Sequence, residues 1–352
     1  MTNNSNFLPD KSGRLSPEDS KSYFSRIGLT CFILGMISLL ISIAAKLLIR
    51  DMFPWVVKDP IISTIVSYGI TIVSLYVLAL PLAALALSPL PKSSPIKEKM
   101  KPSHILAGLS ISFMLTFIGS YISSFILSLT TSDTAVSSTE STLTNLSDTE
   151  LLIHGIFLAL VLPILEELVF RKFLCSRLLP LGEGYAIFFS SIIFALMGEL
   201  YQIPHAFLLG LFFSFIYVKT GKVIYSIIFH CAINLYNGVL GIYMTAKLPI
   251  DEILEILQKD ASEQEIMSML EKYMGVLQIY IWTSLLLIAF IIAGFIICYK
   301  AIRKEKFSLQ AGIIPPAKEH RVGNVLLASG IAASVGYVAA KIILPMVVER
   351  YL

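Results

Sequence analysis

Two adjacent carboxylates, Glu166 and Glu167, lie inside the apolar run LPILEELVFRKFL of residues 162–174. Arg171 follows Glu167 by four residues, so on a helix the two side chains share a face and can pair. Glu166 lies about 100° away around the same helix, because a helix has 3.6 residues per turn. Apolar surroundings make a carboxylate more basic, which suits a general base that activates water. The alternative is that both glutamates line a polar seam near the inner membrane interface.

A second pair of polar side chains occurs in FHCAIN, residues 229–234, which is otherwise apolar. His230 and Asn234 are four residues apart and therefore project from one helical face. A neutral histidine can bind a metal or donate a hydrogen bond, and an asparagine amide can stabilise an oxyanion. The alternative for His230 is a structural hydrogen bond to a neighbouring carbonyl group.

These residues resemble the motifs of a known family. EELVFR fits the pattern EExxxR, HCAIN fits HxxxN, and FLLGLFFSFIYVKTG (207–221) is similar to the family's linker that ends in a Lys-Thr-Gly turn. The family is CPBP, the type II CAAX-processing and bacteriocin-processing membrane endopeptidases, also called Abi-type proteins. The resemblance covers residues 150–240.

The resemblance implies a helical membrane fold with catalytic groups in an intramembrane cavity. In the family pattern Glu166 activates the attacking water, while Glu167 and Arg171 support it. His230 and Asn234 bind or polarise the scissile carbonyl group. Family members are usually described as metalloproteases, which makes Glu166 and His230 the expected ligands of a Zn²⁺ ion. A direct glutamate mechanism without a tightly held metal is the alternative.

The sequence departs from the family at the second motif, which is normally FxxxH. Phe194 is followed by Gly198 at the position of the histidine. A zinc site normally has three protein ligands and a water, so a third ligand must come from elsewhere. Glu199 is adjacent but about 100° off the required face. His205 lies seven residues on, where Pro204 is expected to interrupt the helix.

The composition places these motifs in a membrane protein. Hydrophobic residues make up 56% of the 352 residues and charged residues only 14%, against about 25% in soluble domains. A membrane-crossing helix needs roughly 20 mainly apolar residues. Candidate segments are 27–49, 61–88, 104–130, 151–179, 184–200, 203–218, 223–246, 276–299 and 323–348. We therefore expect an all-α polytopic bundle of about 8–9 helices with a CPBP-like core, in contact with the lipid bilayer. A nucleic-acid partner is excluded, because Lys and Arg cluster at segment ends.

The predicted organisation follows from loops and charges. We expect a cytoplasmic tail (1–26), amino-terminal transmembrane helices (27–130), the CPBP-like core (150–246), an amphipathic outer segment (247–275) and carboxy-terminal transmembrane helices (276–352). The connector 91–103 holds four lysines, whereas 131–150 has no basic residue, which predicts a cytoplasmic amino terminus in a bacterial plasma membrane. The outer segment is expected to form two short helices, either a solvated loop or a lid.

Three functions fit these residues to different degrees. The first is an intramembrane endopeptidase that cleaves a membrane-associated or leader-bearing peptide by glutamate-activated water. The second is a catalytically lapsed scaffold or regulator that binds a membrane or cell-envelope partner, which would accommodate Gly198 directly. The third is a proton-coupled transporter, for which the sequence offers no inverted repeat.

Overall fold

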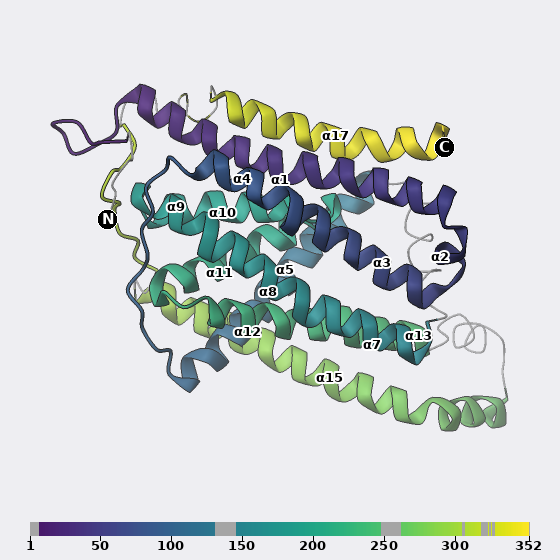
Figure 1. Cartoon of the computed structure of the whole chain (residues 1–352). Helices are drawn as coiled ribbons and strands as arrows, with labels where there is room; N and C mark the ends of the chain where they lie inside the picture. The colour runs from purple at the N-terminus through teal and green to yellow at the C-terminus, as the bar shows by residue number, and fades with distance from the viewer. Residues whose placement is uncertain are drawn as a thin grey trace. The chain divides into compact units, whose positions relative to one another are not determined.

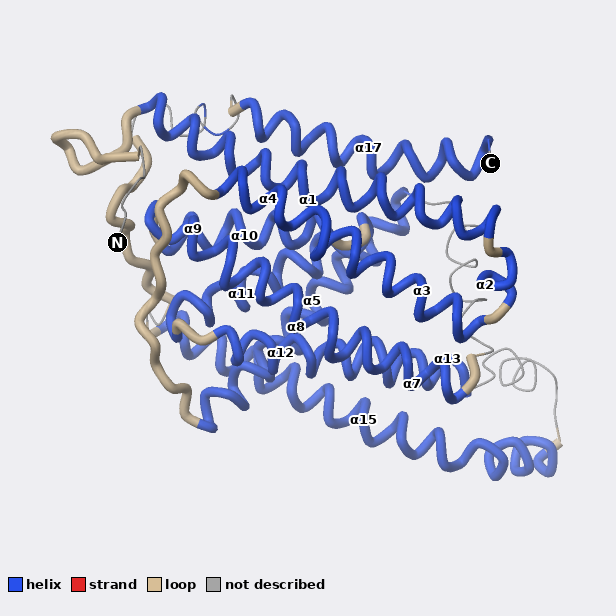
Figure 2. The backbone as a smooth tube through the Cα atoms, in the orientation of Figure 1, coloured by secondary structure: helices blue, strands red, loops and turns tan. Residues whose placement is uncertain are grey.

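The computed structural model describes residues 7–130, 146–247, 262–304, 307–317, 323, 325 and 328–351. The regular structure of these residues is helical, with one isolated bridge between Gly182 and Ala311 (Figures 1 and 2). The described chain divides into two compact units, each built from separate stretches of sequence. Unit 1 comprises residues 1–99, 165–226 and 308–352, and unit 2 comprises residues 100–164 and 227–307.

Unit 1 begins with a long helix and a broken second one. Its helices are α1 (Pro17–Met52), α2 (Pro54–Lys58), α3 (Pro60–Ile72), the π-helix η1 (Val73–Ala79), α4 (Leu80–Leu87), the end of α8 (Leu162–Glu167), the π-helix η3 (Leu168–Cys175), α9 (Ser176–Leu178), η4 (Leu179–Leu181), α10 (Glu183–Met197), η5 (Leu200–Gln202), α11 (Ile203–Thr220), the start of α12 (Val223–Asn234) and α17 (Ser329–Tyr351). The start of α1 is fixed by the Ser16 hydroxyl, which accepts a hydrogen bond from the Asp19 amide, and by Pro17 at the first helical position.

Small residues allow α17 to lie directly against α1. A Cβ atom on Gly28 would overlap the backbone of Gly330, and one on Gly35 would overlap the Tyr337 ring. Glycines at a helix crossing let two backbones approach closely, and in lipid that close packing replaces the hydrophobic drive available in water. The carboxy-terminal helix is thereby held to the first helix of the chain, side by side in Figure 1.

The site-bearing part of unit 1 is a helical hairpin. η3 and α10 run in opposite directions, joined by a short turn at Gly182, whose φ of 128° favours glycine. α11 packs along α10, where a Cβ on Gly210 would lie 3.0 Å from the Ser191 Cβ. The hydroxyls of Ser190 and Ser214, both buried, lie 2.8 Å apart and link the same two helices.

Unit 2 contains α5 (Pro102–Thr130), α7 (Asp148–Ile156), the π-helix η2 (Phe157–Val161), the first part of α8, most of α12, the π-helix η6 (Leu235–Leu240), α13 (Gly241–Lys247) and α15 (Glu263–Arg303). α5 packs on α15 where Gly294 meets the Ser110 backbone. Ser147 and Glu150 form a capping box that starts α7.

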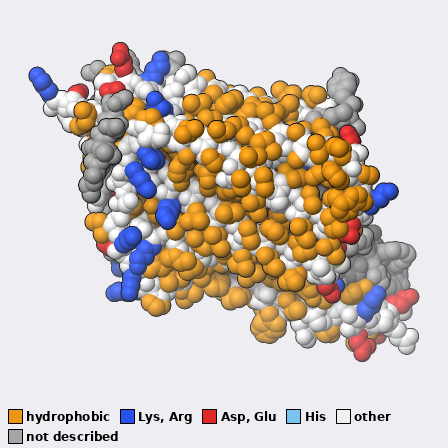
Figure 3. Space-filling model, viewed as in Figure 1, with side chains coloured by type: hydrophobic (Ala, Val, Ile, Leu, Met, Phe, Trp, Pro, Cys, Tyr) orange, Lys and Arg blue, Asp and Glu red, His pale blue; other side chains and the backbone are white. Residues whose placement is uncertain are grey.

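The nine predicted apolar segments all fall on helices. Within the described residues, seven helices are long and apolar enough to cross a membrane, and two shorter apolar helices, Glu183–Met197 and Ser329–Leu344, match the predicted 184–200 and 323–348. The prediction of an all-α polytopic bundle is thus confirmed. Hydrophobic side chains cover most of the face shown in Figure 3.

One element differs from its prediction. The capping box of Ser262 and Glu265 is present, but residues Glu263–Arg303 form one continuous helix. The expected separate short helix ending near residue 275 is therefore wrong. Charged residues such as Glu271 and Lys272 lower the local hydropathy without breaking the helix, because Glu and Lys are good helix formers. The other predicted short helix falls in residues 248–261, which lie outside the described residues.

Candidate functional site

Glu167 and Arg171 form a buried ion pair at the junction of α8 and η3. The Arg171 Nε donates to the Glu167 Oε2 at 3.0 Å, and both side chains are fully buried. The guanidinium carbon lies 4.9 Å from the centre of the Phe194 ring and 5.9 Å from that of Phe213. The pairing that the sequence spacing predicted is therefore confirmed.

The same guanidinium group is held by aromatic faces instead of further hydrogen bonds. Within the described part of the chain, its Nη1 and Nη2 atoms have no hydrogen-bond partner. Phe194 belongs to α10 and Phe213 to α11, so Arg171 ties η3 to both neighbouring helices through cation–π contacts. The pair therefore has a structural role, because its two charges stabilise each other and the packing of these helices.

Glu166 is placed differently from its neighbour. Its side chain is only partly buried, whereas that of Glu167 has no exposed surface. The π-helical turn η3 starts directly after Glu167. Such widened turns often occur at functional sites, because they redirect side chains within a helix. The two glutamates therefore differ in burial, and the catalytic role expected for Glu166 stays a prediction.

In unit 2, His230 and Asn234 both lie on α12. His230 is 5% exposed. The Asn234 Nδ2 donates to the Leu158 carbonyl oxygen in η2 at 2.9 Å. In a π-helical turn the donor to a carbonyl lies five residues on, and for Leu158 that residue is Pro163, which has no N–H, so the side-chain amide satisfies the oxygen. The Asn234 amide thus fixes α12 to η2.

The vacant second-motif position lies at the end of α10. The helix stops at Met197, and Gly198 has extended backbone angles. The Lys341 Nζ of α17 donates to the carbonyl oxygens of Leu196 (3.1 Å), Met197 (3.3 Å) and Gly198. An ammonium group has three donors and suits the partial negative charge of a helix C-terminus.

Tyr337 strengthens this contact one turn earlier on α17. Its hydroxyl donates to the Leu196 carbonyl at 3.1 Å, and the side chain is 3% exposed. The sequence analysis assigned no role to Lys341. The available signal was an ionisable residue within an apolar segment, which generally marks a function or a specific partner.

Position 198 lies in the same layer of unit 1 as the glutamate pair. Arg171 of η3 contacts Phe194 of α10, and the two helices run antiparallel. One turn away from this contact, in the same direction in space, Glu167 lies on one helix and Gly198 on the other. A Cβ at Gly198 would meet only the Ala195 carbonyl oxygen, at 3.7 Å. A Cβ atom therefore fits at the position where the FxxxH pattern expects a histidine.

The two residues considered as a third metal ligand, Glu199 and His205, lie on different elements. Glu199 is exposed and follows the capped end of α10. His205 lies in the first turn of α11, directly after Pro204, so the predicted break between the helices is present. Within each unit, the described His, Cys, Asp and Glu residues include no group of three or more that could hold a metal ion. The family positions themselves supply only Glu166 and His230, one in each unit.

Comparison with known families supports the motif assignment. Residues 148–236 match the family model described as type II CAAX prenyl endopeptidase Rce1-like. This segment of the chain is Rce1-like. It contains Glu166, Glu167, Arg171, His230 and Asn234, and ends two residues after Asn234. No curated protein and no solved structure matched the chain. Lys341 lies outside the matched segment, so the α10 cap comes from a helix that the Rce1-like model does not include.

Proposed function

We propose that this protein is an intramembrane endopeptidase that hydrolyses a peptide bond of a membrane-associated or leader-bearing peptide. The observation that supports it most is the division between the two glutamates. Glu167 is neutralised by Arg171 in a fully buried pair, while Glu166 keeps a partly exposed side chain inside an apolar helix. Inserting such a group into a membrane costs about 2.5–3.5 kcal/mol of free energy, so its presence is consistent with a functional role.

The proposed reaction needs a base and a group that receives negative charge. Glu166 takes a proton from water, and the water oxygen attacks the carbonyl carbon of the scissile bond. Donors from His230 and Asn234 stabilise the resulting oxyanion. The C–N bond then breaks, and Glu166 returns the proton to the leaving amine. The described residues do not make a three-ligand zinc set within either unit, so no step is assigned to zinc.

We further propose that the amino terminus faces the cytoplasm of a bacterial plasma membrane. The connector between α4 and α5 carries Lys92, Lys97, Lys99 and Lys101, and its neighbours in unit 1 include Arg177 and Lys219. Excess Lys and Arg in short connectors mark the cytoplasmic side. A reporter fused at the amino terminus and tested on both sides of the membrane would check this orientation.

A second candidate function has one observation in its favour. Gly198 stands where the second motif is expected to have a histidine, and Lys341 donates hydrogen bonds to the carbonyl groups there. A chain that has lost turnover but keeps the fold would act as a scaffold or regulator for a membrane or cell-envelope protein.

A comparison of membrane-protein termini distinguishes the two functions. Cells would express wild type, Glu166→Gln, His230→Ala or the control Glu263→Gln, whose carboxylate is exposed at the start of α15. We expect new peptide termini with wild type and the control only. Each variant is first matched to wild type by thermal unfolding in detergent. If the termini are the same in all four strains while a cellular phenotype persists, the scaffold function replaces the endopeptidase.

A further inference from the structure

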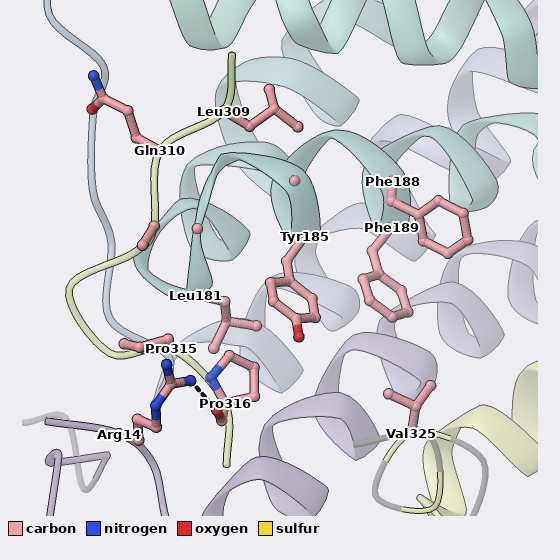
Figure 4. Close-up of a pocket in the computed structure, with 13 residues that line it drawn as sticks. Arg14, Leu181, Tyr185, Phe188, Phe189, Leu309, Gln310, Pro315, Pro316 and Val325 are labelled. Carbon is pink, nitrogen blue, oxygen red and sulfur yellow. Dashed lines mark hydrogen bonds between the residues drawn. The ribbon is translucent and has the colours of Figure 1, made fainter. Parts of the chain in front are cut away.

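A cavity of about 890 Å³ lies in unit 1, beside the first turns of α10, and its lining includes none of the motif residues Glu166, Glu167 and Arg171. Its lining is mostly apolar and includes Leu181, Tyr185, Phe188, Phe189 and Leu309. In Figure 4 Tyr185 and Phe189 project from α10 towards Pro316 and Val325. Its size is in the range of about 300–1,000 Å³ found for small-molecule sites.

The wall opposite α10 is held by backbone hydrogen bonds. The Glu183 amide donates to the Gln310 carbonyl at 3.1 Å, and the Ile314 amide donates to the Pro180 carbonyl at 3.0 Å. A Cβ on Gly312 would overlap the backbone of Pro180, so glycine is required for this close approach. The segment 309–316 is thereby fixed against the turn before α10, and the cavity exists without a ligand.

The cavity opens to the outside of unit 1 beside exposed apolar side chains. Phe188 is 47% exposed and Leu309 is 50% exposed. Tyr185 and Phe189 stack with each other and contact Phe24 of α1, with ring centres 6.1 and 5.1 Å from that ring. An apolar chain can therefore enter sideways between rigid aromatic walls.

The charge on the cavity wall is the Arg14 guanidinium. Its Nη1 donates to the Pro316 carbonyl at 3.2 Å, the bond drawn in Figure 4. No hydrogen bond among the described residues uses its Nη2 or Nε. Glu183, a partly buried carboxylate at the start of α10, already pairs with Lys219 at 2.5 Å and accepts from the Gln310 amide at 2.8 Å. Asp10 is exposed, and its Oδ1 accepts from the backbone amides of Ser12 and Arg14.

This cavity lies at the basic end of unit 1. Arg14 precedes the first turn of α1, and Arg177 donates to the Leu90 carbonyl at the start of the lysine-rich connector. Figure 3 shows Lys and Arg side chains gathered at this end, next to the broad hydrophobic face. The cavity therefore combines an apolar interior with a cation at the level where headgroups meet hydrocarbon.

We propose that this cavity binds one anionic phospholipid. An acyl chain lies between Tyr185, Phe189 and Leu309, and the phosphate lies at Arg14. The acyl chain gains little free energy when it moves from the bilayer into the cavity, because lipid tails are as apolar as the cavity. Selectivity therefore comes from the headgroup, and one arginine near an anionic surface gives a preference of roughly fivefold. The proposal of a lipid site does not require that the protein cleaves peptides.

Photo-crosslinking tests the proposal. The full chain is placed in phosphatidylcholine nanodiscs with a trace of phosphatidylglycerol or phosphatidylcholine carrying a diazirine in its acyl chain. Labelled peptides are mapped by mass spectrometry. We expect the phosphatidylglycerol probe to label residues 181–189 and 309–316 about fivefold more than the phosphatidylcholine probe, with the preference reduced in 1 M salt, where the Debye length falls to about 3 Å.

Two substitutions separate the headgroup from the chain. Arg14→Gln should reduce labelling by the anionic probe to that of the zwitterionic one, whereas Lys11→Gln, an exposed cation in the same loop, should not. Gly184→Leu should lower labelling by both probes, since a Cβ there already contacts the Leu309 side chain at 3.6 Å. Gly69→Leu, where no atom lies within 4 Å of the added Cβ, is the matched control.

The wild-type chain alone can also decide the question. Unlabelled phosphatidylglycerol should compete with the probe more strongly than unlabelled phosphatidylcholine does. Equal labelling by the two probes, or labelling spread evenly over the hydrophobic face, would overturn the proposal even if a variant failed to fold.

Discussion

Lys341 donates a hydrogen bond to the carbonyl of Gly198, the residue at which the sequence departs from the expected FxxxH pattern. The donor lies 143 residues further along the chain, on a helix outside the Rce1-like segment. The end of α10 is thus completed by the carboxy-terminal helix. Because α17 is itself packed on α1, three separate parts of unit 1 determine the geometry of this one turn.

Loss of the Lys341 cap should destabilise the protein. Lys341→Met keeps the apolar stem but removes the ammonium donor from the Met197 and Gly198 carbonyls, while the Leu196 carbonyl keeps the Tyr337 hydroxyl; hydrogen bonds to charged groups contribute about 1.5–3 kcal/mol. We expect a loss of that order in the free energy of unfolding, measured in detergent with increasing SDS. Lys341→Arg should retain part of it. Lys46→Met, an exposed lysine on α1, should change it by less than about 0.5 kcal/mol. Equal effects at the two positions would argue against the cap.

Glycine substitutions should separate the vacant motif position from the helix crossing. Gly198→Ala should be neutral or stabilising by up to about 1 kcal/mol, because the backbone is extended and the added Cβ has room. Gly330→Ala should cost about 1–3 kcal/mol, because its Cβ would overlap the Ser25 carbonyl of α1. The same unfolding measurement compares both. A destabilising Gly198→Ala would mean that the position is more crowded than the structure indicates.

The Glu167–Arg171 pair should be sensitive to the loss of one partner and tolerant of the loss of both. Arg171→Met leaves a buried carboxylate without its cation and should cost about 3–5 kcal/mol. The double variant Glu167→Leu/Arg171→Met should recover most of that loss, since apolar replacement of a buried pair is often neutral. A double-mutant cycle on the free energy of unfolding measures the coupling. Additive losses would show that the two side chains act independently of each other.

The sequence predicted local contacts better than distant ones. The Glu167–Arg171 pair could be predicted because both residues lie on one helix, where spacing determines which side chains meet. The nine apolar segments could be predicted because their length reflects membrane thickness. The Lys341 cap could not be predicted, because it depends on how α17 packs on α1 and reaches α10. The π-helical turns after Glu167 and Asn234 also have no signature in residue spacing.

The long helix α15 shows a different limit. Hydropathy predicts that the membrane span begins near residue 276, and the charged residues before it suggested a separate surface helix. The helix nevertheless continues from Glu263, because charge alone does not stop a helix that has good formers and no proline. Hydropathy identified the apolar part correctly and could not locate the true start.

Asn234 provides a test of the structural role of a predicted site residue. Its Nδ2 satisfies the Leu158 carbonyl in η2, so Asn234→Leu should leave that oxygen buried without its donor, at a cost of about 1–3 kcal/mol. Hydrogen exchange of the amides in residues 157–162 should accelerate in this variant. Asn237→Leu, an exposed asparagine three residues on, is the matched control and should leave exchange in η2 unchanged. If Asn234→Leu abolishes cleavage while exchange in η2 stays at the wild-type rate, Asn234 acts on the substrate and not through η2. Faster exchange together with lost cleavage would instead place its effect in the geometry of unit 2.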